Sequence, residues 1–198
     1  GSAAYAEVET MGFTPNATVT NAIDEQATVL TIGNGQDLDG VKLDTVAYLD
    51  NEIVAVKAIN LVAGTVTVER GVLDTVPTPH LASARIWFAD ALEALVTEQY
   101  LSGESLQVKM LPATGLGRLA ESAAPTDSYT FASRMIRPYP PGNVKVNNLM
   151  WPTVILGQIA LTWSHRDRMQ QTVYLVTQTE ANIGPEAGTI YTVRFYNE

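Results

Sequence analysis

Hydrophobic and polar residues alternate in short runs along most of the chain. In the first part the runs are rich in β-branched and aromatic residues, and Gly, Asn, Asp or Pro separates them. They cover residues 27–34, 45–50, 52–60, 65–72, 84–89 and 106–111. An apolar residue at every second position places one face of a strand against a core. The pattern therefore predicts a mainly β fold.

Two breaks between these runs predict tight hairpins. Asp50 and Asn51 separate one pair of runs, and Ala63 and Gly64 separate the next pair. Such residues suit short turns, so three successive strands form an antiparallel meander. Short, evenly spaced strands predict a small antiparallel β-barrel or sandwich. Residues 90–101 also carry apolar residues at helical spacing, which leaves a short helix open there.

A proline-rich stretch divides the chain. Three prolines fall within residues 138–141, where they fix the backbone and remove hydrogen-bond donors. We expect a domain junction near Pro138, with an acidic β-domain at 1–137 and a second segment at 138–198. Alternating runs in the second segment predict further strands at 144–148, 157–165, 172–179 and 188–197.

Composition and charge narrow the possible functions. The chain has 198 residues, 46% of them hydrophobic, and a formal net charge of −9. Residues 1–137 hold 8 basic and 17 acidic residues, whereas 138–198 hold 4 of each. This acidic part argues against nucleic-acid binding. Without cysteine, disulfides and thiolate metal sites are excluded, and no apolar run is long enough to predict membrane insertion.

Several phrases of the sequence resemble known proteins. "NVKV", "IALTW" and "YTVRFY" after the proline-rich lead-in are similar to the first strands of a fibronectin type III domain. Together with "ERGVLDTVPTPH", "ARIWF" and "YLSGESLQVKMLPATGLGRL", they resemble a tailed-bacteriophage or prophage tail protein of the baseplate or tail-tip type. The resemblance covers about residues 45–198. It implies a virion structural protein, made in the bacterial cytoplasm, whose partners are other phage tail proteins.

The fibronectin-like part is expected to be incomplete. A type III sandwich needs about seven strands over roughly 90–100 residues, and residues 143–198 are fewer than that. Apolar side chains of its first strands would then lack a second sheet: Ile159, Leu161, Trp163, Tyr191, Val193 and Phe195. We expect the C-terminal segment to fold back on the first domain or, preferentially, to form a homo-oligomer by strand pairing.

His80 is the first candidate for chemistry, and the sequence favours a structural role. No second metal ligand stands at a suitable spacing, and no nucleophile elbow accompanies it. We expect its side chain to bond to backbone, and Arg70 to pair with a local carboxylate such as Asp74. The "NGQDLDG" loop at 34–40 fails the register of a calcium loop. The sequence therefore predicts no enzyme activity, no cofactor and no metal site.

The remaining candidates are interaction residues. Arg166 and Arg168 in "HRDR" could bind a carboxylate or phosphate, although a solvated strand end with Asp167 bridging the two arginines is the simpler interpretation. Trp87 and Trp163 are expected in the core, while Trp151 is expected in a loop with an exposed ring. The full set of possible interaction residues is Trp151, Arg166, Arg168, Tyr191 and Phe195. The alternative function is a carbohydrate-binding or adhesin domain that contacts the host surface, although glycan binding is not favoured.

Overall fold

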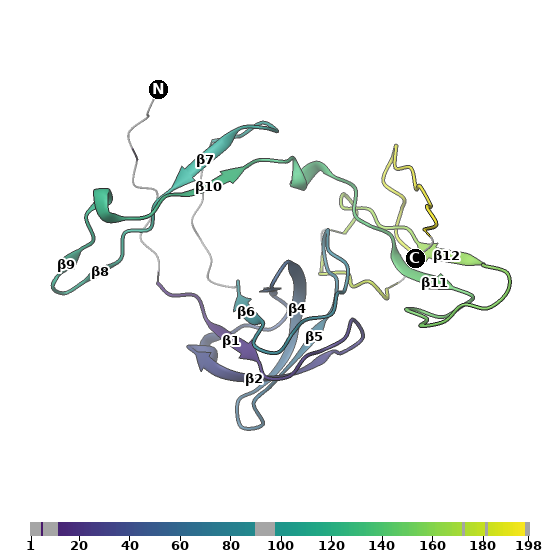
Figure 1. Cartoon of the computed structure of the whole chain (residues 1–198), viewed down its shortest axis with the longest axis horizontal. Helices are drawn as coiled ribbons and strands as arrows, with labels where there is room; N and C mark the ends of the chain where they lie inside the picture. Colours follow the sequence, from purple (N-terminus) through teal and green to yellow (C-terminus); the bar gives the residue numbers. More distant parts are fainter. Residues whose placement is uncertain (1–4, 6–11, 90–97, 172, 181, 197–198) are drawn as a thin grey trace. The chain divides into compact units, whose positions relative to one another are not determined.

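The computed structural model describes residues 5, 12–89, 98–171, 173–180 and 182–196 (Figure 1). Contacts divide the chain into two compact units: Gly1–Ala94 together with Pro138–Glu198, and Leu95–Arg137. The expected domains, 1–137 and 138–198, stay a prediction, and their junction coincides with one boundary between these units. Within the described residues, no helix is long and apolar enough to cross a membrane.

The first unit contains a closed, six-stranded antiparallel barrel. Its strands are β1 (Asn16–Val19), β2 (Val29–Gln36), β3 (Val46–Leu49), β4 (Glu52–Asn60), β5 (Thr65–Glu69) and β6 (Arg85–Phe88). Their order around the barrel is β1-β2-β5-β4-β3-β6. A short helix, η1 (Leu38–Gly40), follows β2. The predicted mainly β fold and antiparallel barrel are confirmed, and β1 is a strand that the sequence pattern did not reveal.

Both predicted hairpins are present. Leu49 pairs with Glu52 across the β3–β4 turn, where Asp50 has a φ of 50°. Asn60 pairs with Thr65 at the β4–β5 turn. The predicted meander of three strands is therefore correct, because these turn residues tolerate the left-handed backbone that a tight hairpin needs.

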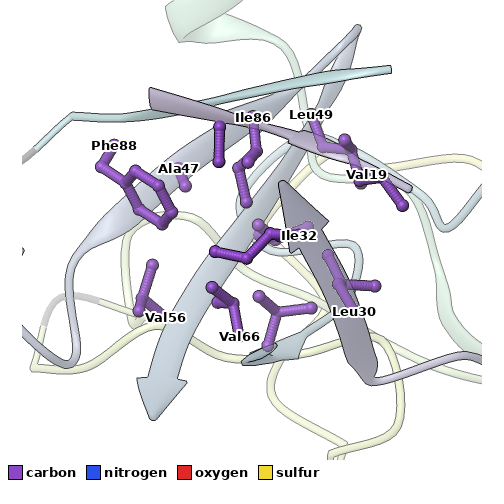
Figure 2. Close-up of a cluster of buried hydrophobic side chains, with 12 residues drawn as sticks. Val19, Leu30, Ile32, Ala47, Leu49, Val56, Val66, Ile86 and Phe88 are labelled. Atoms are coloured by element: carbon purple, nitrogen blue, oxygen red, sulfur yellow. The ribbon is translucent and has the colours of Figure 1, made fainter. Parts of the chain in front are cut away.

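The barrel core is aliphatic with one aromatic ring. Figure 2 shows side chains from all six strands converging on the barrel interior. In β5, Val66 and Val68 are buried while the intervening threonine is half-buried. In β6, Ile86 and Phe88 take the inward positions. Strict alternation then turns Trp87 outward, where it is 42% exposed and lies under the Arg85 guanidinium at 5.3 Å. The expected core position of Trp87 is wrong.

The outer face of β4 is covered as well. Ile53 and Ala55 point away from the barrel core and are buried with Val72 in a second apolar cluster. Leu175, from the C-terminal segment, packs against this cluster. Part of the C-terminal segment therefore folds back on the barrel, which explains why β4 is buried on both faces.

The rest of the C-terminal segment contains one strand pair, β11 (Gly142–Val146) and β12 (Leu161–Ser164). The strands expected at 172–179 and 188–197 are not present in the described residues 173–179 and 188–196. The six apolar side chains expected to lack a cover are half-buried or exposed, and Phe195 is 68% exposed. Leu161 and Trp163 lie in β12, whereas the segments that hold Ile159, Tyr191, Val193 and Phe195 form no ladder with the barrel or with β12.

The second unit, taken by itself, contains two small two-stranded sheets. One pairs β7 (Ser105–Val108) with β10 (Asp127–Thr130), and the other pairs β8 (Ala113–Thr114) with β9 (Gly117–Arg118). Two short helices, η2 (Glu121–Ala123) and η3 (Arg134–Ile136), follow β9 and β10. Most of the possible helix at 90–101 lies outside the described residues.

Candidate functional site

A buried ion pair lies where β4 begins and β5 ends. Arg70 follows β5 directly and Glu52 opens β4, and only 4% and 1% of their side chains are exposed. Arg70 Nε donates to Glu52 Oε1 at 2.8 Å, and Nη2 donates to Oε2 at 2.8 Å. This two-pronged geometry is the strongest pairing available to an arginine and a carboxylate. The expected pairing of Arg70 with Asp74 is wrong.

The other donors of Arg70 are used by the backbone. Nη1 donates to the carbonyls of Asp24 and Ala27, both at 2.9 Å, and Nη2 donates to the carbonyl of Thr78 at 2.7 Å. All five N–H groups of the guanidinium therefore have an acceptor. A single buried side chain thus ties the β1–β2 loop and the loop before β6 to the end of β5.

His80 completes the buried network. Its Nε2 lies 3.0 Å from Glu52 Oε2, its Nδ1 lies 2.8 Å from Asp50 Oδ2, and its side chain is 3% exposed. Its backbone pairs in both directions with Ile23. The expectation that the His80 side chain bonds to backbone is wrong, because the β3–β4 turn places two carboxylates beside the ring.

The Arg70 guanidinium and both ring nitrogens of His80 face two carboxylates, those of Glu52 and Asp50. A ring nitrogen donates to a carboxylate where it carries a proton. Burial of charge is tolerated where each ion is paired and hydrogen-bonded in this way.

Glu52 is the centre of the network. Besides Arg70 and His80, its oxygens accept from the backbone N–H of Gly71 at 2.9 Å and of Thr78 at 3.1 Å. Burial raises the pKa of Glu52, whereas the hydrogen bonds from Arg70 and His80 lower it. The hydrogen bonds prevail, so the pKa of Glu52 lies below its ordinary value of 4.5. The carboxylate is held ionised as the anchor of the loop at 70–80.

A second set of contacts joins this loop to the C-terminal segment. Arg166 Nη1 donates to the carbonyl of Gly71 at 3.2 Å, and Nη2 donates to the carbonyl of Val176 at 2.9 Å. Gln178 donates through Nε2 to the carbonyl of Thr75 at 3.3 Å and through its backbone N–H to that of Arg70 at 3.3 Å. The buried Arg166 side chain thus joins the C-terminal segment to the loop at 70–80.

The expectation of a solvated "HRDR" end is therefore wrong for two of its members. Arg166 and Asp167 are buried, and the Asp167 carboxylate accepts from the backbone N–H of Met169 and from the Gln170 side chain. Arg168 pairs with Glu186 at 2.9 Å. Arg166 and Arg168 therefore do not form an exposed pair of cations for a carboxylate or phosphate.

The other expected interaction residues lie in different surroundings. The Tyr191 hydroxyl is 3.2 Å from His165 Nδ1, and its ring lies 5.6 Å from that of Trp163. Trp163 is half-buried in this aromatic contact. Phe195 is exposed. No shared site for Trp151, the arginines and these aromatics emerges among the described residues.

Trp151 lies on a cavity of about 340 Å³. Its lining residues come from two parts of the chain: Glu25, Gln26, Thr28, Glu69, Arg70 and Pro77 from the barrel strands and their loops, and Met150, Trp151 and Thr177 to Glu180 from the C-terminal segment. A second cavity of about 620 Å³ lies beside β4, lined by Asp44, Ala55, Lys57, Gln171, Val173, Tyr174 and Leu175. Among the described residues, no group of three or more His, Asp or Glu is arranged to hold a metal ion.

Sequence reasoning missed the network and this cavity. Glu52 directly precedes four apolar residues, 53–56, and a charged residue next to such positions is the one local signal for the ion pair. Nothing local connects residue 25 with residue 151. No family model matches the chain, and no curated protein matches it.

Proposed function

We propose that this chain is a structural module of a phage or prophage tail, at the tail tip or baseplate, and that it works by protein contacts rather than catalysis. The observation that carries the proposal is the second unit, which has almost no core. Among described residues 98–137, Ala124 alone is buried. An isolated two-stranded sheet is at best marginally stable in water. Such a unit needs another surface to cover it.

The exposed apolar side chains of this unit also indicate that another surface covers it. Met135 is 90% exposed and Ile136 is 67% exposed. Further exposed apolar side chains in the unit are Leu101, Val108, Met110, Leu116, Leu119 and Tyr129. Proteins that act alone rarely expose so many large apolar groups in a short segment, whereas assembly subunits do so at their interfaces.

The sequence resemblance supplies the class of assembly. A small barrel is followed by a unit that has almost no core of its own. This arrangement suits a subunit that neighbouring proteins cover, as in the tip of a phage tail. The fibronectin type III-like character of residues 138–198 belongs to this proposal. The β11–β12 pair supports it, and the lack of strands in described residues 173–179 and 188–196 counts against a regular sandwich.

Immunoelectron microscopy tests the proposed location. Antibodies raised against the purified chain are applied to tailed particles induced from the bacterium that encodes it. We expect gold particles at the free end of the tail. Labelling confined to cell debris, with unlabelled tails, would overturn the proposal.

A carbohydrate-binding or adhesin domain is the second candidate. The observation that favours it is Trp151 on a cavity with polar side chains around it, because ligand sites combine aromatic faces with a few placed polar groups. We expect no saturable glycan-array binding by the isolated chain. Micromolar binding that Trp151→Ala abolishes would promote the adhesin candidate over the tail module.

A further inference from the structure

The cavity beside Trp151 is lined by several negatively charged side chains, which suit a cationic ligand. Three of its lining residues carry carboxylates: Glu25, Glu69 and Glu180. Glu25 has no hydrogen-bond or ion-pair partner among the described residues. Glu69 lies 3.6 Å from Lys57 Nζ, a long and exposed pairing. Glu180 accepts the backbone N–H of Thr177 through Oε2 only. Acceptor capacity therefore remains at all three carboxylates.

The one cation in the lining does not offset this charge at close range. Arg70 directs all five of its N–H groups to Glu52 and to three backbone carbonyls. It has no donor left for a ligand. An anionic ligand would thus meet carboxylates without a cation to pair with, and a cationic ligand would meet unused acceptors.

The cavity lining also includes an aromatic ring and apolar side chains. Trp151 is half-buried, and Met150 and Pro77 line the cavity with it. A guanidinium stacks on an indole face, and its planar fork pairs with carboxylates in two-pronged fashion. A volume of about 340 Å³ is near the lower end of the range for small-ligand sites, about 300–1,000 Å³. One arginine side chain and its backbone would fit such a space.

The geometry points to a docking site for an arginine side chain presented by a partner protein of the same assembly. The inference rests on the proposed function, and it names the chemistry of one contact. The guanidinium would lie against Trp151 and pair with Glu25, while Glu69 and Glu180 add to the negative field. Charge complementarity with the acidic part of the chain, residues 1–137, favours a basic partner segment.

An NMR titration with single amino-acid probes tests the site directly. The probe is Nα-acetyl-arginine amide, and its neutral isostere, Nα-acetyl-citrulline amide, is the matched control. The indole N–H signal of Trp151 is assigned from its loss in Trp151→Phe. We expect a saturable shift with the arginine probe at millimolar concentration and none with citrulline. The shift should weaken as salt is added.

Variants locate the binding in the cavity. Glu25→Gln should weaken the arginine probe about two- to fivefold, the range for a partly exposed ion pair. Asp39→Asn removes the same charge at a position that does not line the cavity and should leave the affinity unchanged. Trp151→Ala, followed through the Thr179 amide, should weaken binding about two- to fivefold. Unchanged melting temperatures show that the variants remain folded.

Three results would overturn the inference. They are equal binding of arginine and citrulline, no saturable shift with either probe, and equal affinity in Glu25→Gln and the original chain. Saturable binding of N-acetylglucosamine without arginine binding would assign the cavity to a sugar instead. The titration tests only ligand binding in the cavity. A negative result would therefore overturn the arginine site without affecting the proposed location in the tail, which the labelling experiment tests separately.

Discussion

The replacement Glu52→Gln tests whether the buried network holds the barrel together. The change keeps the size of the side chain and removes the charge with which Arg70 pairs. A glutamine side chain accepts hydrogen bonds only through its oxygen. Its NH₂ group would therefore face the groups that now donate to Glu52 Oε2, which are Arg70, Thr78 and His80. Arg70 would then stay buried without its counter-charge.

The structure sets the expected size of the effect. Both members of the ion pair are almost fully buried, and removing one partner of such a pair costs about 3–5 kcal/mol. Native proteins have a total free energy of unfolding of about 5–15 kcal/mol. For a chain of this length 1 kcal/mol lowers Tm by about 2–4 °C. We therefore expect Glu52→Gln to lower Tm by roughly 6–20 °C.

Urea unfolding followed by circular dichroism measures the change. Glu69→Gln is the matched control, because it removes the same charge from the next strand, where the carboxylate is 3.6 Å from an exposed Lys57. We expect that control to cost less than about 1 kcal/mol. An equal slope with urea in both variants shows that the same structure unfolds. A loss below about 1 kcal/mol in Glu52→Gln would refute the view that this ion pair organises the barrel end.

Three further predictions follow from named contacts. The pKa of Glu52 is lower in the folded chain than its ordinary 4.5. The contribution of its carboxylate to stability is therefore complete above pH 4.5 and is lost as the pH falls through the folded pKa. When Tm is measured against pH, it should fall more steeply below pH 4.5 in the original chain than in Glu52→Gln. Gly71→Ala should destabilise the chain by about 1–3 kcal/mol, because φ is +60° and the new Cβ would lie 2.4 Å from Gln178 Cγ. Gly188→Ala, with φ +83° and no atom within 4 Å, isolates the backbone strain, and an equal loss in urea titrations of both variants would remove Gln178 from the explanation. Calcium or EDTA should leave Tm unchanged, since the loop at 34–40 lacks the ligand register of a calcium loop; a shift of several degrees would contradict this.

Local patterns in the sequence account for much of the barrel. The run at 65–72 alternates in the way that β5 requires, the run at 52–60 has the bounds of β4, and the turn residues tolerate the tight hairpins observed. These features depend on residues next to one another, so a reading of the chain can find them. The same method failed for Trp87, because either face of an alternating strand could be the inner one. Ile86 and Phe88 fill the barrel, and Trp87 is left outside.

Partners far apart in the chain could not be found in this way. Arg70 was expected to meet a nearby carboxylate, yet its partner lies 18 positions away on a neighbouring strand. Arg166 was expected in solvent, yet it reaches a carbonyl 95 positions away. The first pairing depends on the register between β4 and β5, and the second depends on where the C-terminal segment packs against the loop at 70–80.

The sequence by itself determined the β class, the three-strand meander and the acidic character of the first 137 residues, because local propensity, turn chemistry and charge are properties of short segments. Only the tertiary structure decided which carboxylate Arg70 takes, that His80 bonds to two acids, and that Glu25 and Trp151 share a cavity. Burial supplies the reason. A charge taken out of water must find a partner wherever the fold supplies one, and here the pairing of β4 with β5 and the packing of the C-terminal segment supply it.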